Sequence, residues 1–223
     1  MSEAGFSYVI LAFLGFGAII VFLSFQYEKN RTQKFKEIAD QVRLSFEEKG
    51  DGWISGLENQ FPLFSRGRSK RIRNVLRGKT KNAEISIFDY RYVTGGGRNS
   101  STHKQSVILL QSEGMELPAF AMRPENIFHK IGSTLGFQDI DFPNHPTFSN
   151  KYLLQGQDEH LIRDLFSREL LKFLEKGTPI CLQGCGNRLL YFRHRKRIKP
   201  NELKEFLEGG MEILSRLQNA SGV

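Results

Sequence analysis

Two aspartates and two histidines in the second half of the chain have the residue types of a metal or hydrolase site. Asp139 and Asp141 follow a D-x-D spacing, which puts both carboxylates on one side of an extended segment, and His129 and His145 lie nearby in sequence. However, no H-E-x-x-H frame accompanies them, and aspartates before a proline loop commonly form turns or caps. A membrane-tethered, metal-dependent enzyme using Asp139, Asp141 and His145 is therefore the second hypothesis.

Two other motifs resemble sites but lack the required spacing. Cys181 and Cys185 are the only cysteines, and His194 alone does not complete the four ligands of a zinc site. We expect two thiols that are buried or partly buried in a hairpin of a reduced, cytoplasmic domain. The run Gly95-Gly96-Gly97 lacks the G-x-x-x-x-G-K-[ST] spacing of a phosphate-binding loop and does not open a helix, so it predicts a hairpin tip. The sequence predicts no catalytic residue, metal site or cofactor.

Lysine and arginine concentrate in two runs that could bind anions. The formal net charge is +8, which favours anionic lipid, nucleic acid or an acidic protein as partner. The two runs could form one surface that contacts lipid or a partner, or two unrelated solvated loops. Nucleic acid is the third hypothesis, because the first run lacks interleaved aromatic residues for base stacking, and nothing indicates a small-molecule substrate. The candidate contact residues are Arg66, Arg68, Lys70, Arg71, Arg73, Arg77, Lys79, Lys81, Arg193, Arg195, Lys196 and Arg197.

The element that would position these residues is an uncharged stretch near the N-terminus. Residues 6 to 25 read FSYVILAFLGFGAIIVFLSF, long enough as a helix to cross the roughly 30 Å hydrocarbon core of a bilayer. A cleaved signal peptide is disfavoured, because the start is not basic and no small-residue cleavage site follows. A buried core helix is disfavoured by the length of the uncharged run at an extreme terminus. We predict a transmembrane helix over residues 6–26.

The charges on either side of this stretch predict its orientation. No lysine or arginine precedes it, whereas Lys29, Arg31, Lys34 and Lys36 follow closely. Under the positive-inside rule, residues 1–5 lie outside the membrane and the rest of the chain lies in the cytoplasm. Beside a membrane, the anionic lipid surface is the default counter-charge for the basic runs, and each base near it contributes about 1 kcal/mol.

The remainder of the chain reads as a stalk and one α+β domain. Residues 27–50 carry an apolar stripe typical of a helix, which packs on the domain or lies on the bilayer or a partner; its members are Phe35, Ile38, Ala39, Val42 and Phe46. Residues 51–217 predict antiparallel β-hairpins with about three packed helices on one face of the sheet. Residues 218–223 predict a frayed tail.

Within the domain, composition and turn signals predict the individual elements. The main hairpin covers residues 83–111, with Ile85 and Ile87 near Leu110 and Ile108. The first half of the domain also predicts a short strand at 71–77, a strand at 117–122 and a helix from 125 to 135. The second half predicts a loop at 137–150 followed by a strand, a helix at 158–176, a hairpin over 180–196, and a last helix from Pro200 that Gly209-Gly210 could kink.

Several segments also resemble a group of uncharacterised bacterial proteins that have one N-terminal span. They are IFDYRYVTGGG, QSVILL, LPAFAMRPENIFHKIG, DIDFPNHPTFSNKYLLQGQDEHLIRDLF and LLYFRHRKRIKPNEL, and the resemblance covers about residues 60 to 217. It implies a bacterial inner-membrane protein with a cytoplasmic α+β domain, and it implies no activity. The leading hypothesis is a non-enzymatic, single-span accessory or scaffold subunit whose partners are the lipid bilayer and a membrane-protein complex.

Overall fold

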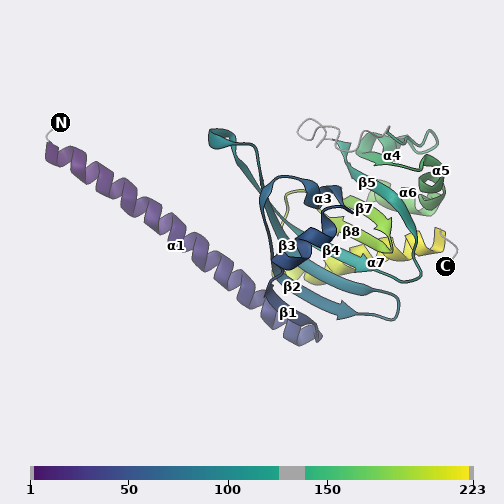
Figure 1. The fold of residues 1–223 in the computed structure, drawn as a ribbon, viewed down its shortest axis with the longest axis horizontal. Helices are drawn as coiled ribbons and strands as arrows, with labels where there is room; N and C mark the ends of the chain where they lie inside the picture. The colour runs from purple at the N-terminus through teal and green to yellow at the C-terminus, as the bar shows by residue number, and fades with distance from the viewer. Residues whose placement is uncertain (1–2, 126–138, 221–223) are drawn as a thin grey trace.

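An antiparallel β-sheet of eight strands forms the centre of the α+β domain, and one long helix projects from it (Figure 1). The computed structural model describes residues 3–125 and 139–220. The strands are β1 (Ser45–Lys49), β2 (Arg68–Lys79), β3 (Glu84–Thr94), β4 (Ser101–Gln111), β5 (Leu117–Pro124), β6 (Tyr152–Gly156), β7 (Cys181–Gly186) and β8 (Arg188–Phe192). The α-helices are α1 (Glu3–Val42), α2 (Ile54–Leu57), α3 (Pro62–Ser65), α4 (Pro146–Lys151), α5 (Glu159–Leu165), α6 (Arg168–Lys176) and α7 (Leu203–Ala220).

The sheet is built from hairpins, as the sequence predicts. The strand order is β1-β2-β3-β4-β8-β7-β5-β6, and all of these neighbours pair antiparallel. In the β3–β4 hairpin, Ile85 lies opposite Leu110 and Ile87 opposite Ile108, so the predicted register is confirmed. The strand predicted at 71–77 is part of the longer β2, and the turn between β7 and β8 is tight, with Cys185 opposite Arg188.

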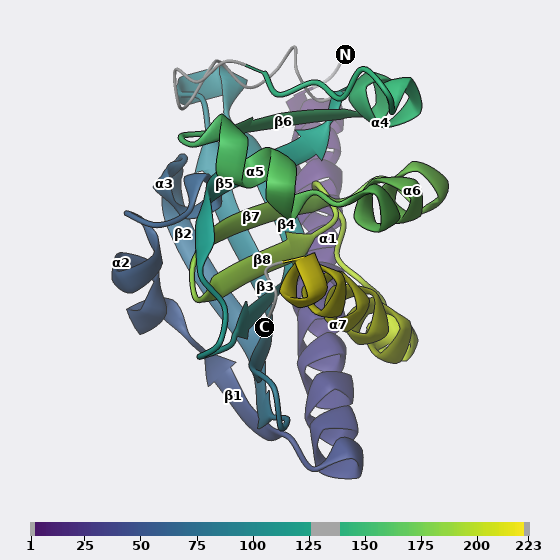
Figure 2. The same ribbon diagram turned by 90° about the vertical axis from the view of Figure 1, so that its right-hand side faces the viewer.

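Side chains on both faces of the sheet are covered by helices. Helices α1, α5, α6 and α7 pack on one face, over a core that includes Ile87, Ile108 and Leu189. The short helices α2 and α3 cover the opposite face, over Phe88, Tyr90 and Val107 (Figure 2). Successive residues of a strand point to opposite faces, which explains why Ile87 and Phe88 belong to different cores. The prediction of helices on one face only is therefore wrong, because the segment from 53 to 65 folds over the other face.

Helix α7 approaches the sheet closely where two glycines face it. A Cβ atom at Gly210 would lie 3.2 Å from Cδ1 of Ile108, and one at Gly209 would lie 2.8 Å from the hydroxyl oxygen of Tyr191. Helix α7 is continuous through this pair, so the glycines permit close packing and do not interrupt the helix.

The predicted stalk helix ends earlier than the sequence pattern indicates. Helix α1 continues without interruption from the apolar stretch to Val42, and residues 45–49 form the edge strand β1. Arg43 has a φ of 57°, a left-handed conformation that ends the helix, and β1 then pairs with β2. The predicted apolar stripe is confirmed at Phe35 and Ala39, which are buried on α1. Phe46 also packs against the core, but it does so from the strand β1. Here tertiary pairing with β2 overrides the local helical pattern.

The helix predicted over 158–176 consists of two helices. Helix α5 ends at Leu165, and α6 begins at Arg168, where the Ser167 side chain accepts a hydrogen bond from the backbone N–H of Leu170. A serine that caps a helix start competes with continuation of the preceding helix. The break lets both helices place their apolar sides on the sheet.

The structure also differs from the sequence prediction, or does not cover it, in three shorter segments. The predicted loop at 137–150 contains the helix α4, which begins at a proline and leads directly into β6. Residues 218–220, predicted as frayed, belong to α7. The predicted helix from 125 to 135 lies almost entirely outside the described residues.

The burial of α7 generates the first prediction. Leu214 on α7 is 1% exposed, whereas Leu161 on α5 is 53% exposed. We expect Leu214→Ala to lower the free energy of unfolding by about 2–5 kcal/mol, because it removes apolar contacts and leaves a cavity. Leu161→Ala is the matched control and should change it by less than about 1 kcal/mol. Urea unfolding in mild detergent, followed by the fluorescence of the single tryptophan, measures both; equal losses would contradict the packing described.

Candidate functional site

A buried polar junction connects α1 to the domain. It forms where the second half of α1 lies against the sheet, and its centre is Arg31, only 5% exposed. The Arg31 guanidinium donates from Nε to Oδ2 of Asp89 at 2.6 Å and from Nη2 to Oδ1 at 2.8 Å. Asp89 lies on β3 and is also buried. This two-pronged geometry is the strong, directional form of an ion pair.

Neighbouring groups satisfy the rest of this buried pair. Arg31 donates from Nη1 to the backbone carbonyl of Ile198 at 2.8 Å. Asp89 accepts from the Ser106 hydroxyl at 2.7 Å and from the Asn74 amide at 3.0 Å, and Thr32 of α1 donates to the Asn74 amide oxygen at 2.8 Å. The network therefore joins α1 to β2, β3, β4 and the segment before α7. A buried charge pair is tolerated when its remaining hydrogen-bonding capacity is filled in this way.

A second connection lies one helical turn closer to the N-terminus, at Glu28. Its carboxylate accepts two hydrogen bonds from Arg197, at 2.7 and 3.0 Å, and one from Lys104 at 2.8 Å. Burial alone would raise the pKa of Glu28, but the hydrogen bonds and charges of Arg197 and Lys104 lower it to about 2. Glu28 and Arg31 together connect the second half of α1 to the domain at two points, which defines the direction of α1 relative to the sheet.

The first basic run is largely neutralised within the fold. Five of its eight basic side chains form ion pairs with acids that lie far away in sequence or across a turn: Lys70 with Glu58, Arg71 with Asp51, Arg73 with Glu48, Arg77 with Glu47, and Lys79 with Glu84. Arg68 donates to the backbone carbonyl of Gly95 and to the Ser100 hydroxyl, and Lys81 is exposed. The run is thus a ladder of paired charges along β1 and β2, which reduces its capacity to attract an external anion.

The second basic run lies against β4, two strands away from β2. The backbone N–H of Arg195 donates to the Gln105 side chain, and the N–H of Ser106 donates to the carbonyl of Lys196. Arg193 is paired with Glu205 at 3.8 Å and Arg197 with Glu28, whereas Arg195 and Lys196 are exposed. Because β3 and β4 separate the runs, their middle parts do not form one continuous surface.

The two runs do meet at one end, in a cationic cluster around His194. Burial, then the charges of Arg195, His103, Arg66 and Arg123, lower the pKa of His194 to about 4. His103 stacks on Tyr92, with ring centroids 4.7 Å apart, and its Nε2 lies 2.6 Å from the Thr94 hydroxyl. Arg66, His194 and Arg195 belong to the two basic runs of the sequence. The sequence did not indicate Arg123 or His103 as their neighbours, because only the sheet register brings these residues together.

The residues of the metal hypothesis have separate partners. Asp139 accepts a hydrogen bond from the Gln155 side chain at 2.8 Å, and His145 Nδ1 lies 3.0 Å from the carboxylate of Glu175. At Asp141 it is the backbone carbonyl that accepts a hydrogen bond, from Arg163. Across 3–125 and 139–220, no group of three or more histidine, cysteine, aspartate or glutamate side chains could hold a metal ion. His129 lies outside these ranges.

The two cysteines lie on β7 and are not bonded to each other. Cys181 is buried, and burial raises the pKa of its thiol to about 12. Cys185 is partly buried near the end of the strand. A thiol with a raised pKa is a poor nucleophile and a poor metal ligand at neutral pH, which fits the prediction of thiols packed within a hairpin.

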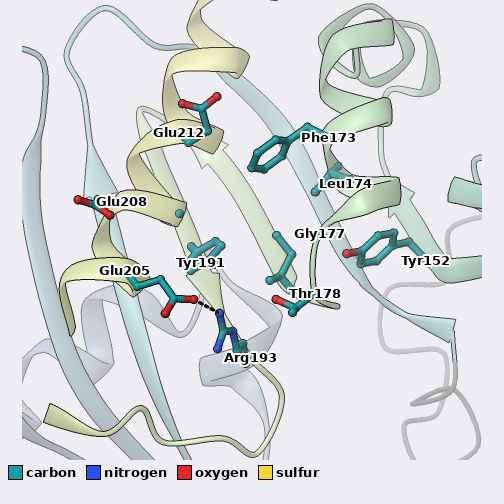
Figure 3. A pocket seen from close by; sticks show the side chains of 12 residues that line it. Tyr152, Phe173, Leu174, Gly177, Thr178, Tyr191, Arg193, Glu205, Glu208 and Glu212 are labelled. Carbon is teal, nitrogen blue, oxygen red and sulfur yellow. Dashed lines mark ion pairs between the residues drawn. The ribbon is translucent and has the colours of Figure 1, made fainter. Parts of the chain in front are cut away.

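A groove of about 400 Å³ lies between α6 and α7, over the ends of β6 and β8. Figure 3 shows its apolar and aromatic wall of Phe173, Leu174, Tyr152 and Tyr191 facing a rim of glutamates on α7. Each rim glutamate has a basic partner: Glu205 with Arg193, Glu208 with Lys204, and Glu212 with Arg216. The groove is therefore mixed in polarity with balanced charges, and it has no paired nucleophile and base among its lining residues.

These features define an α+β domain with a helix suited to membranes and a polar junction that fixes that helix. Helix α1 is long and apolar enough to cross a bilayer by length and composition. No protein family matches the sequence, and no curated protein matches it. Among solved structures, the chain is similar to the crystal structure of the mycobacterial trehalose monomycolate transport factor A, TtfA, with a TM-score of 0.61 and 11% identity over 85% of this chain and 93% of that one. At this identity the likeness concerns the fold.

The junction generates a prediction about the buried ion pair. Arg31→Met leaves the Asp89 carboxylate buried without its countercharge, which should lower the free energy of unfolding by about 3–5 kcal/mol. The double variant Arg31→Met/Asp89→Leu should recover part of this loss. Arg73→Met, which breaks an exposed pair with Glu48, is the control and should cost less than about 1 kcal/mol.

Urea unfolding of the full chain in mild detergent measures these variants, and the double-mutant cycle gives the coupling between Arg31 and Asp89. If Arg31→Met were no more destabilising than Arg73→Met, the junction would not carry the role assigned to it.

The cationic cluster generates a prediction about pH. Folded His194 stays neutral down to about pH 4, whereas an unfolded histidine binds a proton below about pH 6.5. Between these values the unfolded chain binds more protons, so stability falls as the pH falls. His194→Gln should reduce the loss of stability from pH 7 to pH 5 by on the order of 1 kcal/mol, after allowance for partial exposure.

Thermal unfolding at both pH values provides the measurement. His160→Gln, on the exposed side of α5, is the matched control and should follow the wild-type profile. A His194→Gln profile that also matches the wild type would contradict the electrostatic description of the cluster.

Proposed function

We propose that this protein is a single-span accessory or scaffold subunit that holds its α+β domain at the cytoplasmic face of a bacterial inner membrane. It engages a membrane-protein complex, the lipid surface, or both, and it does not act through a catalytic centre. The observation that carries the proposal is the continuity of α1, whose exposed apolar half leads without a break into a half that is built into the domain.

The exposed half of α1 has the surface of a membrane span. Its large apolar side chains are between 52% and 74% exposed; they are Phe13, Leu14, Phe16, Ile19, Ile20, Val21, Phe22, Leu23 and Phe25. An apolar surface of this extent is stable in hydrocarbon and unfavourable in water. The predicted span of 6–26 ends shortly before Glu28, which is the first residue of the junction.

The junction gives the anchor a mechanical role. A flexible linker would let a tethered domain explore all orientations, whereas the Glu28 and Arg31 connections hold α1 and the sheet as one body. A fixed orientation presents the same surface to every membrane partner and lowers the entropy cost of binding. This is the property that a scaffold or accessory subunit requires.

The charge distribution supports the cytoplasmic orientation. Lys29, Lys34 and Lys36 are exposed on the domain side of the predicted span, and residues before the span carry no basic side chain. Of the candidate contact residues, Arg68, Lys81, Arg195 and Lys196 are exposed and form no ion pair with residues 3–125 or 139–220, although the charge of Lys196 acts on Glu202. We assign lipid or partner contact to Arg68, Arg195 and Lys196, which lie near the cationic cluster. The groove between α6 and α7 is a second surface for an apolar side chain of a partner.

The likeness to TtfA supports an accessory role. The name of that protein assigns it to the transport of trehalose monomycolate. A shared fold is compatible with a shared manner of working beside a membrane, while the cargo is a property of each protein's own site. We therefore extend to this chain only a role as an accessory factor of a membrane process.

The span generates a prediction about membrane retention. Phe16→Arg combined with Ile20→Arg should move a large part of the chain from the membrane pellet to the soluble or degraded fraction, because each arginine at the helix centre costs about 2.5–3.5 kcal/mol of insertion. Val42→Arg, on the same helix but in the domain half, is the control and should stay in the pellet.

High-speed centrifugation without detergent and a topology reporter at the C-terminus measure the outcome. We expect the wild-type chain in the pellet and the reporter in the cytoplasm. A wild-type chain in the supernatant, or an external reporter, would contradict the proposed function.

A further inference from the structure

The tip of the β3–β4 hairpin, residues 94–101, is an exposed polar segment that the proposed function does not yet use. It contains Gly95, Gly96, Gly97, Arg98, Asn99 and Ser100, all of them exposed. Figure 1 shows the tip projecting from the domain in the same general direction as the N-terminal half of α1, and Figure 2, turned by 90°, agrees. The tip therefore points toward whatever the exposed half of α1 enters.

The reach of the tip follows from the contact between α1 and β4. Lys104 Nζ lies 2.8 Å from the Glu28 carboxylate, so we take Lys104 and Glu28 to lie at the same height along the axis of α1. From Lys104 to Ser100 the strand extends about 13 Å toward the tip, at about 3.3 Å per residue. From Glu28 to Gln26, where the predicted span ends, α1 rises only about 3 Å. With α1 along the bilayer normal, these lengths would carry Ser100 about 10 Å beyond Gln26, whereas the headgroup layer is about 5–7 Å thick and begins there. Membrane helices tilt by about 20° on average and by up to about 40°. Because the tip lies to one side of α1 (Figure 1), a tilt of α1 that raises this side places the tip at the headgroups.

The chemistry of the tip suits that layer. Residues 91–112 contain no aspartate or glutamate. Arg98 is exposed at the tip, Arg68 and Arg91 flank its base, and Arg195 lies beside the neighbouring start of β4. Glycine, asparagine and serine supply backbone and hydroxyl donors without an apolar side chain that would insert deeper. Donors and cations without carboxylates match phosphate oxygens.

The tip is also held in place. The Arg68 guanidinium donates to the Gly95 carbonyl and to the Ser100 hydroxyl, which ties both sides of the tip to β2. Gly95 and Gly97 have φ values of 74° and 52°, which glycine adopts without strain. A pre-ordered tip loses little conformational entropy when it binds a surface.

We infer that the β3–β4 hairpin tip is a second membrane contact, which binds the phosphate groups of anionic lipids in the leaflet adjoining the domain end of α1. This inference rests on the proposed function, because it requires α1 to span the bilayer. Helix α1 and the hairpin tip then hold the protein at two separated points on the membrane, which restricts the tilt of α1 and the domain, as one body, relative to the bilayer.

Full-length protein in nanodiscs of phosphatidylcholine with phosphatidylglycerol provides the test. An environment-sensitive fluorophore is attached at Ser100→Cys in a Cys185→Ser background, and lipids with a quencher near the headgroup report contact. Asn82→Cys, in the turn at the opposite end of β3, is the matched control site. We expect strong quenching at position 100 and little at position 82.

A charge variant then tests the chemistry. Arg98→Glu should lower the bound population of the tip by about fivefold or more in these nanodiscs, since one base near an anionic surface contributes about a factor of five. Lys81→Glu, beside the control turn, has the same change of charge and should leave quenching at position 100 unchanged. Replacing phosphatidylglycerol with further phosphatidylcholine should weaken quenching, whereas added inorganic phosphate should not replace the lipid.

The outcomes separate this inference from the proposed function. Nanodisc incorporation of the labelled chain reports the span independently of the tip. If the chain incorporates but position 100 is no more quenched than position 82, the tip does not contact lipid and the inference is overturned while the span stands. Equal effects of Arg98→Glu and Lys81→Glu would also overturn it. A chain that fails to incorporate refutes both.

Discussion

The buried ion pair between Arg31 and Asp89 is the interaction on which the rest of the structure depends. Apolar contacts are not directional, so they alone would allow α1 to pack on the sheet in more than one direction. Burial of the Arg31 guanidinium is costly unless a carboxylate and a carbonyl are placed to accept its hydrogen bonds, and Asp89 and Ile198 supply these acceptors. Apolar contacts of Phe35 and Ala39 add stability, but they tolerate sliding. The ion pair selects a single register between anchor and domain, which is the use of buried charge that is best attested.

This constraint links the fold to the proposed function. With Glu28 as a second connection, the helix leaves the domain at a defined angle, and every surface of the domain acquires a defined distance from the membrane. The exposed basic residues near the cationic cluster and the β3–β4 hairpin lie at the end of the domain from which α1 emerges. The α6–α7 groove is a separate surface beside α7. In the proposed function, the same junction therefore places one end of the molecule at the lipid and leaves the other surfaces open to partners.

Local patterns in the sequence predicted much of the fold. Alternating residues gave the β3–β4 hairpin with its register, and glycine and proline signals gave the start of the last helix and the β7–β8 turn. The errors arose where long-range pairing decides the structure. Residues 45–49 continue a helical stripe but become a strand because β2 offers hydrogen bonds, and α2 and α3 fold over a sheet face whose need for cover is not visible locally.

The candidate site was harder to predict for the same reason. A basic run without an acid looks like a free positive surface, yet Arg77 meets Glu47 from 30 residues away and Arg73 meets Glu48 across the same strand pair. Arg31 counted toward orientation as a flanking charge, but its partner lies 58 residues later, in a strand. Which charges remain available to lipid is a property of the sheet order.

The most direct test of the central claim is a pulsed electron paramagnetic resonance distance between α1 and the far end of the sheet. Spin labels at Gln26→Cys and Asn82→Cys, in full-length protein lacking Cys185 and held in lipid nanodiscs, report whether helix and domain move together. The account predicts one narrow distance distribution that broadens when Arg31→Met is introduced. A broad distribution in the protein with Arg31 intact would contradict it.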